Sequence, residues 1–238
     1  MAGILKIIFG PNLLLAATAA STMLTLWMIF IWVPTETEQG NIYRAVFFHA
    51  PLAWVSMVSI IGVSVASLAY LKFKDVRWDR LAVAMAESGV VAGALMLISG
   101  MLWAKPQWQT WWTGEAKLNT ALIMFFIYVA YLMFRAYYPA GAQRQRLAAT
   151  IAVIGAVDSL IVYVAADLWE RAHPPIIVGP ASGEGEFASE FGLTVLVSLV
   201  TFSLIYCLVV SERYRLRSAE DALAELKRRV GSMAGAGA

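Results

Sequence analysis

The sequence predicts an all-α fold, a polytopic membrane bundle of six transmembrane helices. Of the 238 residues, 60% are hydrophobic and only 14% are charged, and the mean hydropathy is +0.69. A soluble domain of this size does not carry so much apolar surface. Several runs of about 20 residues contain almost no charge, the length that a helix needs to cross about 30 Å of hydrocarbon. As helices these runs satisfy their own backbone hydrogen bonds, which equally long apolar loops could not do.

The apolar runs and the charges that flank them place each helix along the chain. We expect helices at about 12–33, 50–71, 81–103, 117–137, 147–166 and 190–211, so that residues 1–211 form one transmembrane domain. The first run is too long for a signal peptide and lacks a small-residue cleavage site, so we interpret it as a retained helix.

A basic tail follows the sixth helix, at residues 212–238. Small and apolar residues recur there at helical spacing among many charges: Leu216, Ala219, Leu223, Leu226 and Val230. This pattern is compatible with a solvated anchor tail or with an amphipathic helix lying on the inner membrane surface. Residues 231–238 are small, and we expect them to be disordered.

The basic residues predict the orientation of the chain in the membrane. With the N-terminus inside, the cytoplasmic segments would hold most of them: Lys6, Lys72, Lys74, Arg77, Arg80, Arg135, Arg144, Arg146, Arg213, Arg215, Arg217, Lys227, Arg228 and Arg229. The outside would keep only four: Arg44, Lys105, Lys117 and Arg171. Because cytoplasmic loops carry an excess of Lys and Arg, both termini are predicted to be cytoplasmic. The outer segments are then 34–49, 104–116 and 167–189.

Several function classes are excluded by motifs that the sequence lacks. The single cysteine, Cys207, allows no disulfide, no Cys-x-x-Cys redox pair and no Cys-x-x-Cys-His attachment motif of a c-type cytochrome. No Gly-x-x-x-x-Gly-Lys-Ser/Thr phosphate loop occurs, so any ATP-driven step requires another subunit. A net charge of +2, with basic residues at the membrane edges, does not indicate nucleic-acid binding.

The two histidines of the chain, His49 and His173, both fall in outer segments. Pro51 suits the first turn of a helix and would fix His49 at the water boundary where the second helix begins. Pro174 and Pro175 force extended backbone beside His173. Two neutral imidazoles held at an apolar edge are what a haem iron takes as axial ligands. The alternative for each is a surface histidine with a water partner.

A single outer segment and its margins, between the two histidines, contain four tryptophans: Trp103, Trp108, Trp111 and Trp112. An aromatic belt at the membrane interface accounts for one or two tryptophans but not for four. A flat aromatic shelf offers rigid apolar area to a porphyrin face, while the indole N–H groups bond to polar partners. The four outer basic residues are candidate partners for the porphyrin propionates.

Three segments, taken in this order, resemble the CcmC haem-handling family of the cytochrome c maturation system. Residues 39–44, Gln-Gly-Asn-Ile-Tyr-Arg, followed by His49-Ala50-Pro51, resemble the family's first outer loop and its histidine. Residues 103–119 resemble its tryptophan-rich WWD motif, and residues 167–173, Asp-Leu-Trp-Glu-Arg-Ala-His, resemble the segment with its second histidine. The resemblance runs from the first helix through the sixth.

The resemblance implies a haem-handling protein of the bacterial inner membrane that is not an enzyme. It implies that His49 and His173 are the axial ligands of a non-covalently bound, transient haem b. The aromatic residues against the porphyrin would be Trp103, Trp108, Trp111, Trp112 and Trp169. The polar and propionate contacts would be Arg44, Lys105, Glu115, Lys117 and Arg171. Haem would pass to the membrane-tethered haem chaperone CcmE, beside ABC-type Ccm subunits that supply the ATPase.

The chain departs from the family signature in one stretch. The signature runs Trp-Trp-x-Trp-Asp-x-Arg, whereas residues 111–117 read Trp-Trp-Thr-Gly-Glu-Ala-Lys. One indole is missing, at Gly114. Glu115 and Lys117 keep the sign of the usual charges but not their reach or bidentate geometry, so the polar contacts of this loop stay open.

Two carboxyl groups, Glu87 and Asp158, fall inside predicted transmembrane helices, where burying a charge is costly. Glu87 lies near the cytoplasmic end of its helix and could reach the interface. For Asp158 we favour a structural hydrogen bond to a neighbouring helix over a polar route through the membrane. The small residues Gly89, Gly93 and Gly155 are expected to serve close helix packing.

Two other functions compete with haem delivery. A b-type cytochrome that transfers electrons usually buries its histidines inside helices, often in pairs, and the sequence predicts neither feature. A transport or channel subunit without haem leaves the tryptophans and the outer histidines unexplained. Absorption spectra of the protein and of its His49→Ala and His173→Ala variants distinguish these alternatives.

Overall fold

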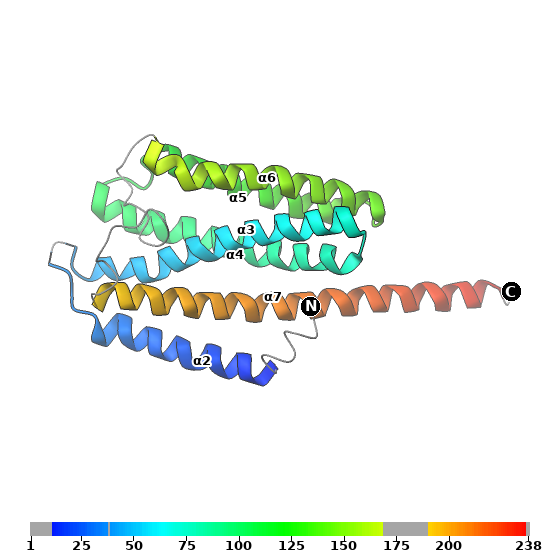
Figure 1. Cartoon of the computed structure of the whole chain (residues 1–238), viewed down its shortest axis with the longest axis horizontal. Coiled ribbons are helices and arrows are strands. Elements are labelled where there is room, and N and C mark those ends of the chain that lie inside the picture. Colours follow the sequence, from blue (N-terminus) through cyan, green and yellow to red (C-terminus); the bar gives the residue numbers. More distant parts are fainter. Residues whose placement is uncertain (1–10, 38, 169–189, 237–238) are drawn as a thin grey trace.

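The computed structural model describes residues 11–37, 39–168 and 190–236, and these form a bundle of long helices (Figure 1). The helices are α2 (Pro11–Trp27), α3 (Val46–Phe73), α4 (Val76–Trp108), α5 (Ala116–Tyr137), α6 (Ala142–Leu168) and α7 (Glu190–Ala236). A π-helical turn, η1 (Met28–Trp32), continues α2, and a 3-10 helix, η2 (Asn41–Ala45), precedes α3. No strand occurs in the described ranges; Glu36 and Gly40 form an isolated bridge. The predicted all-α membrane bundle is confirmed.

The length and apolar composition of the helices make this a membrane bundle. Five of the six, all except α6, are long and apolar enough to cross a bilayer within the described residues. The helix α6 has 27 residues and packs against α3 and α5, although its last side chains are outside the described part. Large apolar side chains such as Met23, Ile31 and Phe126 are exposed on the outside of the bundle. This is the pattern expected of helices that face lipid.

Successive helices run in opposite directions, so the connecting segments gather at two ends (Figure 1). At one end lie η1, the segment 33–40, η2 and the segment 109–115 between α4 and α5, together with the last turn of α6 and the first turn of α7. We call it the tryptophan end. The other end contains the α3–α4 and α5–α6 turns and most of the arginines, and we call it the basic end.

The central helix α3 packs against α4, α6 and α7, and α2 reaches the bundle through α7. Close approach of α3 and α4 depends on glycine. A Cβ atom at Gly89 would lie 2.2 Å from Ser59 Oγ, and one at Gly93 would lie 3.2 Å from Ser56 Oγ. A Cβ atom at Gly155 of α6 would lie 2.9 Å from Ile127. The predicted packing role of these glycines is confirmed.

Two helices extend further at the tryptophan end than the sequence predicts. The helix α3 begins at Val46 instead of residue 50, so Pro51 lies inside it and the prediction of a first-turn proline is wrong. The helix α4 continues through Pro106 to Trp108, past the predicted end at residue 103. Each proline removes one helical hydrogen bond and leaves the helix otherwise intact. As a result, His49, Trp103 and Trp108 stand on helices and not on loops.

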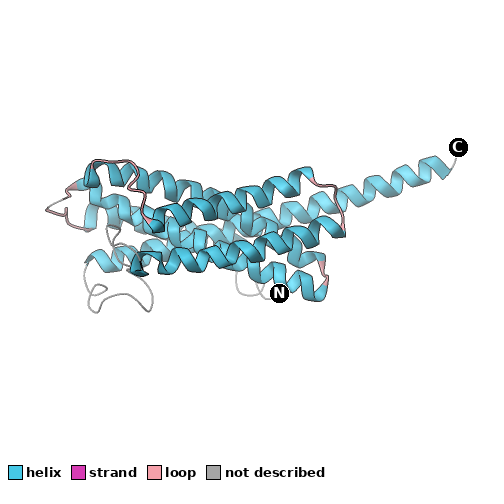
Figure 2. Cartoon of the chain, turned by 90° about the horizontal axis from the view of Figure 1, so that it is seen from above, coloured by secondary structure: helices cyan, strands magenta, loops and turns pink. Residues whose placement is uncertain are grey.

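The last helix, α7, is one continuous helix of 47 residues that projects well beyond the bundle (Figure 2). At 1.5 Å per residue it is about 70 Å long, roughly twice the hydrocarbon thickness of a bilayer. Because the tail continues the axis of the transmembrane part, it does not lie flat on the membrane surface. The prediction that residues 231–238 are disordered is wrong as far as Ala236, the last helical residue.

Ion pairs join the helices at the basic end. Asp79 of α4 accepts two hydrogen bonds of 2.7 Å each from Arg135 of α5, and both side chains are buried. Glu87, which sequence places within the membrane, accepts hydrogen bonds from Arg213 and Arg217 of α7. The two arginines neutralise its charge. We predicted that Asp158 forms a hydrogen bond to a neighbouring helix. Its Oδ2 atom is buried and has no hydrogen-bond partner among the described residues.

Candidate haem site at the tryptophan end

His49 lies one turn inside α3, with its imidazole against α4. Its Nδ1 is 3.1 Å from the carbonyl oxygen of Met96 and 3.2 Å from Ser99 Oγ. A carbonyl oxygen only accepts hydrogen bonds, so the bond to Met96 requires a proton on Nδ1. In that neutral tautomer the lone pair is on Nε2, the nitrogen that is then able to bind a metal. Histidines that bind metals commonly donate their other N–H to such a backbone carbonyl.

Two indoles continue from His49 toward the end of α4. The ring centroid of Trp103 lies 6.3 Å from that of His49, and Trp108 lies 6.1 Å from Trp103. Trp103 is buried, and its Nε1 donates a 3.3 Å hydrogen bond to Gln39 Oε1 of the segment before η2. Gln39 therefore holds the indole beside the imidazole and links the segment before η2 to α4.

The loop 109–115 is held by hydrogen bonds of its own side chains. Trp112 Nε1 donates to Asn119 Oδ1 at 3.0 Å, and Asn119 Nδ2 donates to the carbonyl of Gly114 at 2.8 Å. Thr110 Oγ1 donates to the carbonyl of Trp112 at 3.1 Å. Gly114 has φ +77°, in the left-handed region that favours glycine. The missing indole of the signature thus falls at a position where a tryptophan would be strained.

The remaining loop residues divide into one exposed aromatic and one buried acid. The indole of Trp111 is half exposed, and Lys105 Nζ lies 6.0 Å from its ring centroid. The same ammonium group donates to the carbonyl of Gln109 at 2.9 Å. Glu115 is buried just before α5 and accepts a 2.8 Å hydrogen bond from Thr113 Oγ1. Lys117 follows in the first turn of α5.

Arg44 binds the end of the first membrane helix. Its guanidinium donates to the carbonyl oxygens of Ile29 and Val33 and to Thr35 Oγ1. These carbonyls belong to η1 and the residue after it, where helical acceptors lose their partners and the helix dipole is negative. Most donors of Arg44 are therefore used within the chain, in a role that the sequence did not predict.

Three predicted site residues, Trp169, Arg171 and His173, lie outside the described residues. The helices that flank their segment both have an end at the tryptophan end of the bundle (Figure 1). The structure thus brings together His49, the four tryptophans of residues 103–112, Arg44, Lys105, Glu115 and Lys117 at one end of the molecule.

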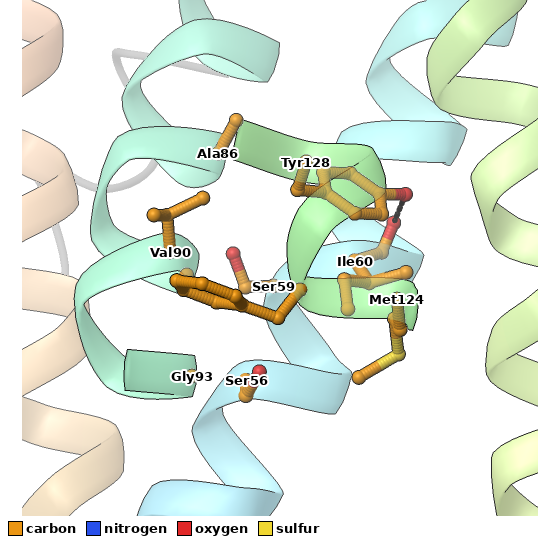
Figure 3. A pocket seen from close by; sticks show the side chains of 10 residues that line it. Ser56, Ser59, Ile60, Ala86, Val90, Gly93, Met124 and Tyr128 are labelled. Atoms are coloured by element: carbon orange, nitrogen blue, oxygen red, sulfur yellow. Dashed lines mark hydrogen bonds between the residues drawn. The ribbon is translucent and has the colours of Figure 1, made fainter. Parts of the chain in front are cut away.

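A cavity lies deeper in the bundle, between α3, α4 and α5 (Figure 3). Its walls include Ser56, Ser59, Gly93 and Tyr128. It has room for no more than about one water molecule, so a porphyrin does not fit. Haem binding within this part of the membrane bundle is therefore not supported, and the tryptophan end remains the candidate site. Among the described residues no cluster of His, Cys, Asp and Glu suits a bare metal ion.

Sequence reasoning missed the residues that support the site. Gln39, Met96, Ser99, Gly100 and Asn119 each hold or accommodate a predicted site residue. Gln39 and Asn119 fall in the segments that carry the family resemblance, which is a weak signal for them. Met96, Ser99 and Gly100 lie in an ordinary apolar helix, and only the packing of α3 on α4 reveals them.

The chain is similar to known proteins of one family. The family model described as "CcmC: Heme exporter protein C" matches residues 7–229. Heme exporter protein C of Bradyrhizobium diazoefficiens is 30% identical over 73% of this chain and 65% of its own length. The Escherichia coli K12 protein of the same name is 30% identical over 69% of this chain and 67% of its own length. A ccmC-like mitochondrial protein of Marchantia polymorpha is 27% identical over 77% of this chain and 72% of its own length.

The match to the family model covers α2 to α6, the segment 109–115 between α4 and α5, and α7 as far as residue 229. In the two alignments with the bacterial relatives, this chain covers about two thirds of each relative's length. The chain belongs to the CcmC family, the heme exporter protein C family.

Proposed function

We propose that this chain binds haem at the tryptophan end and delivers it for the biogenesis of c-type cytochromes. The observation that carries the proposal is the position of His49: its Nδ1 donates to a backbone carbonyl of α4, and Trp103 lies beside the ring. The description of the matching family, heme exporter protein C, supports haem as the molecule that is carried. The protein acts as a carrier and not as an enzyme, since its task is to hold and release haem b without covalent attachment.

In this proposal His49 and His173 bind the iron from opposite sides. With iron–imidazole bonds of about 2 Å, their two coordinating nitrogens come within roughly 4 Å of each other. The indole of Trp103 lies beside His49, and that of Trp108 lies beside Trp103. In this proposal both indoles meet the same face of the porphyrin as the His49 imidazole. Trp111, half exposed at the rim, offers further aromatic area, with Trp112 and Trp169 completing the shelf.

The charged residues at this end supply contacts for the haem propionates. Lys105, Lys117 and Arg171 are suited to this role because each can place a cation beside a carboxylate. Arg44 already donates to four acceptors of the chain, so its contribution is mainly to hold the segment that carries Gln39. Glu115 is buried and bonded to Thr113, and it shapes the loop.

The partners and orientation follow from the same proposal. The tryptophan end faces the periplasm of a bacterial inner membrane, both termini are cytoplasmic, and haem passes to the chaperone CcmE. ABC-type Ccm subunits supply the ATP-driven step, because the sequence contains no phosphate-binding loop. The arginines at the basic end support this orientation.

Absorption spectroscopy of the purified protein with added haem tests the proposal. The wild type is expected to show the Soret band of a low-spin haem, and His49→Ala and His173→Ala are expected to weaken or shift it. Trp111→Ala should lower the affinity for haem, whereas Trp54→Ala, which removes a similarly exposed indole of α3 that bonds to Ser203 of α7, should not. Equal spectra for the wild type and both histidine variants would contradict haem ligation.

Delivery is tested separately by co-purification. With haem present, wild-type protein in detergent is expected to retain tagged CcmE and to transfer haem to it, while His49→Ala transfers little. Transfer that is unaffected by both histidine substitutions would show that the chaperone receives haem by another route.

A further inference from the structure

The His49 imidazole of α3 contacts one turn of α4, residues 96–100. The carbonyl of Met96 and the hydroxyl of Ser99 lie within hydrogen-bond distance of the ring. Gly100 has no side chain, which leaves space for the ring. We propose that this turn is a cradle that positions His49 for iron, with Ser99 and Gly100 as positioning residues. The inference rests on the proposed haem function and adds residues to it.

The hydrogen bonds of the cradle fix which nitrogen carries the proton. Ser99 Oγ donates to the Met96 carbonyl at 3.0 Å, so its oxygen is left to accept from His49 Nδ1. The Met96 carbonyl accepts from the same nitrogen. Both acceptors require the proton on Nδ1, and the lone pair therefore stays on Nε2.

The same bonds make His49 a stronger ligand. A hydrogen bond donated by Nδ1–H shifts electron density toward Nε2 and raises the basicity of the ring. Such a ligand favours ferric over ferrous iron, so hydrogen bonding to the ring is one way in which a protein sets the potential of a haem. The cradle thus bears on the strength of iron binding as well as on the direction of the ring.

Gly100 provides the space that the ring occupies. A Cβ atom at this position would lie 2.9 Å from His49 Cε1 and 3.3 Å from Nδ1. Small residues in membrane helices allow a neighbouring group to approach closely. At Gly100 this group is the imidazole, since the ring atoms of His49 are the three nearest atoms that a methyl group would meet.

The burial of Trp103 one turn further along α4 supports the cradle. Its indole lies 6.3 Å from the imidazole and is tied to Gln39 by its N–H. The ring of His49 thus contacts the 96–100 turn and lies near an anchored indole of the same helix. These contacts restrict its rotation, which is what a preorganised ligand requires.

Two substitutions in the full-length protein test the cradle, with haem as the probe. Gly100→Ala should displace the ring and weaken haem binding by about 10- to 100-fold, the usual effect of losing a partner that orients a metal ligand. Ser99→Ala should cause a smaller loss of affinity and raise the midpoint potential of bound haem, because Nδ1–H loses one acceptor. Ser99→Thr, which keeps the hydroxyl, should restore both values.

Matched controls come from the same helix. Gly93→Ala places a methyl group 3.2 Å from Ser56 Oγ, in the same α3–α4 interface but away from His49. Ser88→Ala removes a hydroxyl that bonds only to the carbonyl of Ala84, four residues earlier. Both controls should leave the spectrum and the midpoint potential of the haem unchanged.

The outcomes distinguish the cradle from the proposed function. Loss of the haem spectrum in His49→Ala, together with wild-type affinity and potential in Gly100→Ala and Ser99→Ala, would overturn the cradle alone. An unchanged spectrum in His49→Ala would overturn haem ligation by this residue, and the cradle with it. Weaker haem binding in Gly100→Ala and Ser99→Ala and a raised potential in Ser99→Ala, with both control variants unchanged, would support the cradle.

Discussion

Two residues at the tryptophan end have structural roles that their residue types alone do not indicate. Arg44 is an outer cation by sequence, yet its guanidinium binds the last carbonyls of the first membrane helix. Gly114 stands where the family signature has an indole, and its backbone is in the left-handed region. Both residues fix the backbone around the candidate site: Arg44 at the end of the first membrane helix and Gly114 in the loop 109–115.

Gly114→Ala is expected to lower the free energy of unfolding by about 1–2 kcal/mol, the cost of the left-handed conformation for a residue with a Cβ atom. No atom lies within 4 Å of the added carbon, so the cost is purely conformational. Gly114→Asn should be milder, because asparagine tolerates this region. Denaturant unfolding in detergent measures the effect.

Gly231→Ala is the matched control for that measurement. Gly231 is equally open, but it lies in the helical part of the tail with ordinary backbone angles. There alanine should raise stability slightly, since it is the better helix former. Equal effects of the two alanines would contradict the conformational role of Gly114.

At the scale of helices, a buried ion pair fastens α5 to α4. Arg135 and Asp79 form two hydrogen bonds of 2.7 Å, with side chains only 11% and 7% exposed. Arg135→Ala should cost about 3–5 kcal/mol of stability, because it leaves the Asp79 carboxylate buried without its cation. A thermal melt of the detergent-solubilised protein reports the loss.

Arg77→Ala serves as the comparison at the same end of α4. Its partner is Asp75, and the arginine is 75% exposed, so solvent screens the pair. We expect a melting temperature close to that of the wild type. An Arg135 variant as stable as the Arg77 variant would show that the buried pair does not hold the helices together.

Sequence predicted the helices well where apolar length decides the structure and less well where their ends depend on neighbours. The periodicity and charge boundaries located all six helices. Pro51 was expected in the first turn of its helix, and the next helix was expected to end at residue 103, yet α3 begins before Pro51 and α4 continues through Pro106. The charged tail was expected to be separate, but no residue breaks the helix between 190 and 236.

Sequence likewise predicted some residues of the candidate site and missed others. His49 and the four tryptophans of residues 103–112 are rare residue types in a clear topological pattern, and the structure places them at one end. Ser99 and Gly100 are common in membrane helices and give no signal of their own. Their role depends on the contact between two helices, which no local pattern encodes.

For the whole molecule, we predict that the tryptophan end is periplasmic and that the projecting part of α7 is cytoplasmic. In a Cys207→Ser background, Thr37→Cys should react with a membrane-impermeant maleimide in intact spheroplasts. Glu220→Cys should react only after lysis. Both positions are exposed, so accessibility reflects the side of the membrane. The reverse labelling pattern would contradict the orientation.

The central claim is that His49 and His173 bind one haem iron at the tryptophan end. Electron paramagnetic resonance of the ferric haem complex tests it most directly. The wild type should give the low-spin signal of an iron with two imidazoles, and each single alanine variant should change to a high-spin or differently ligated signal. A low-spin bis-imidazole signal that persists in His49→Ala or in His173→Ala would contradict the account.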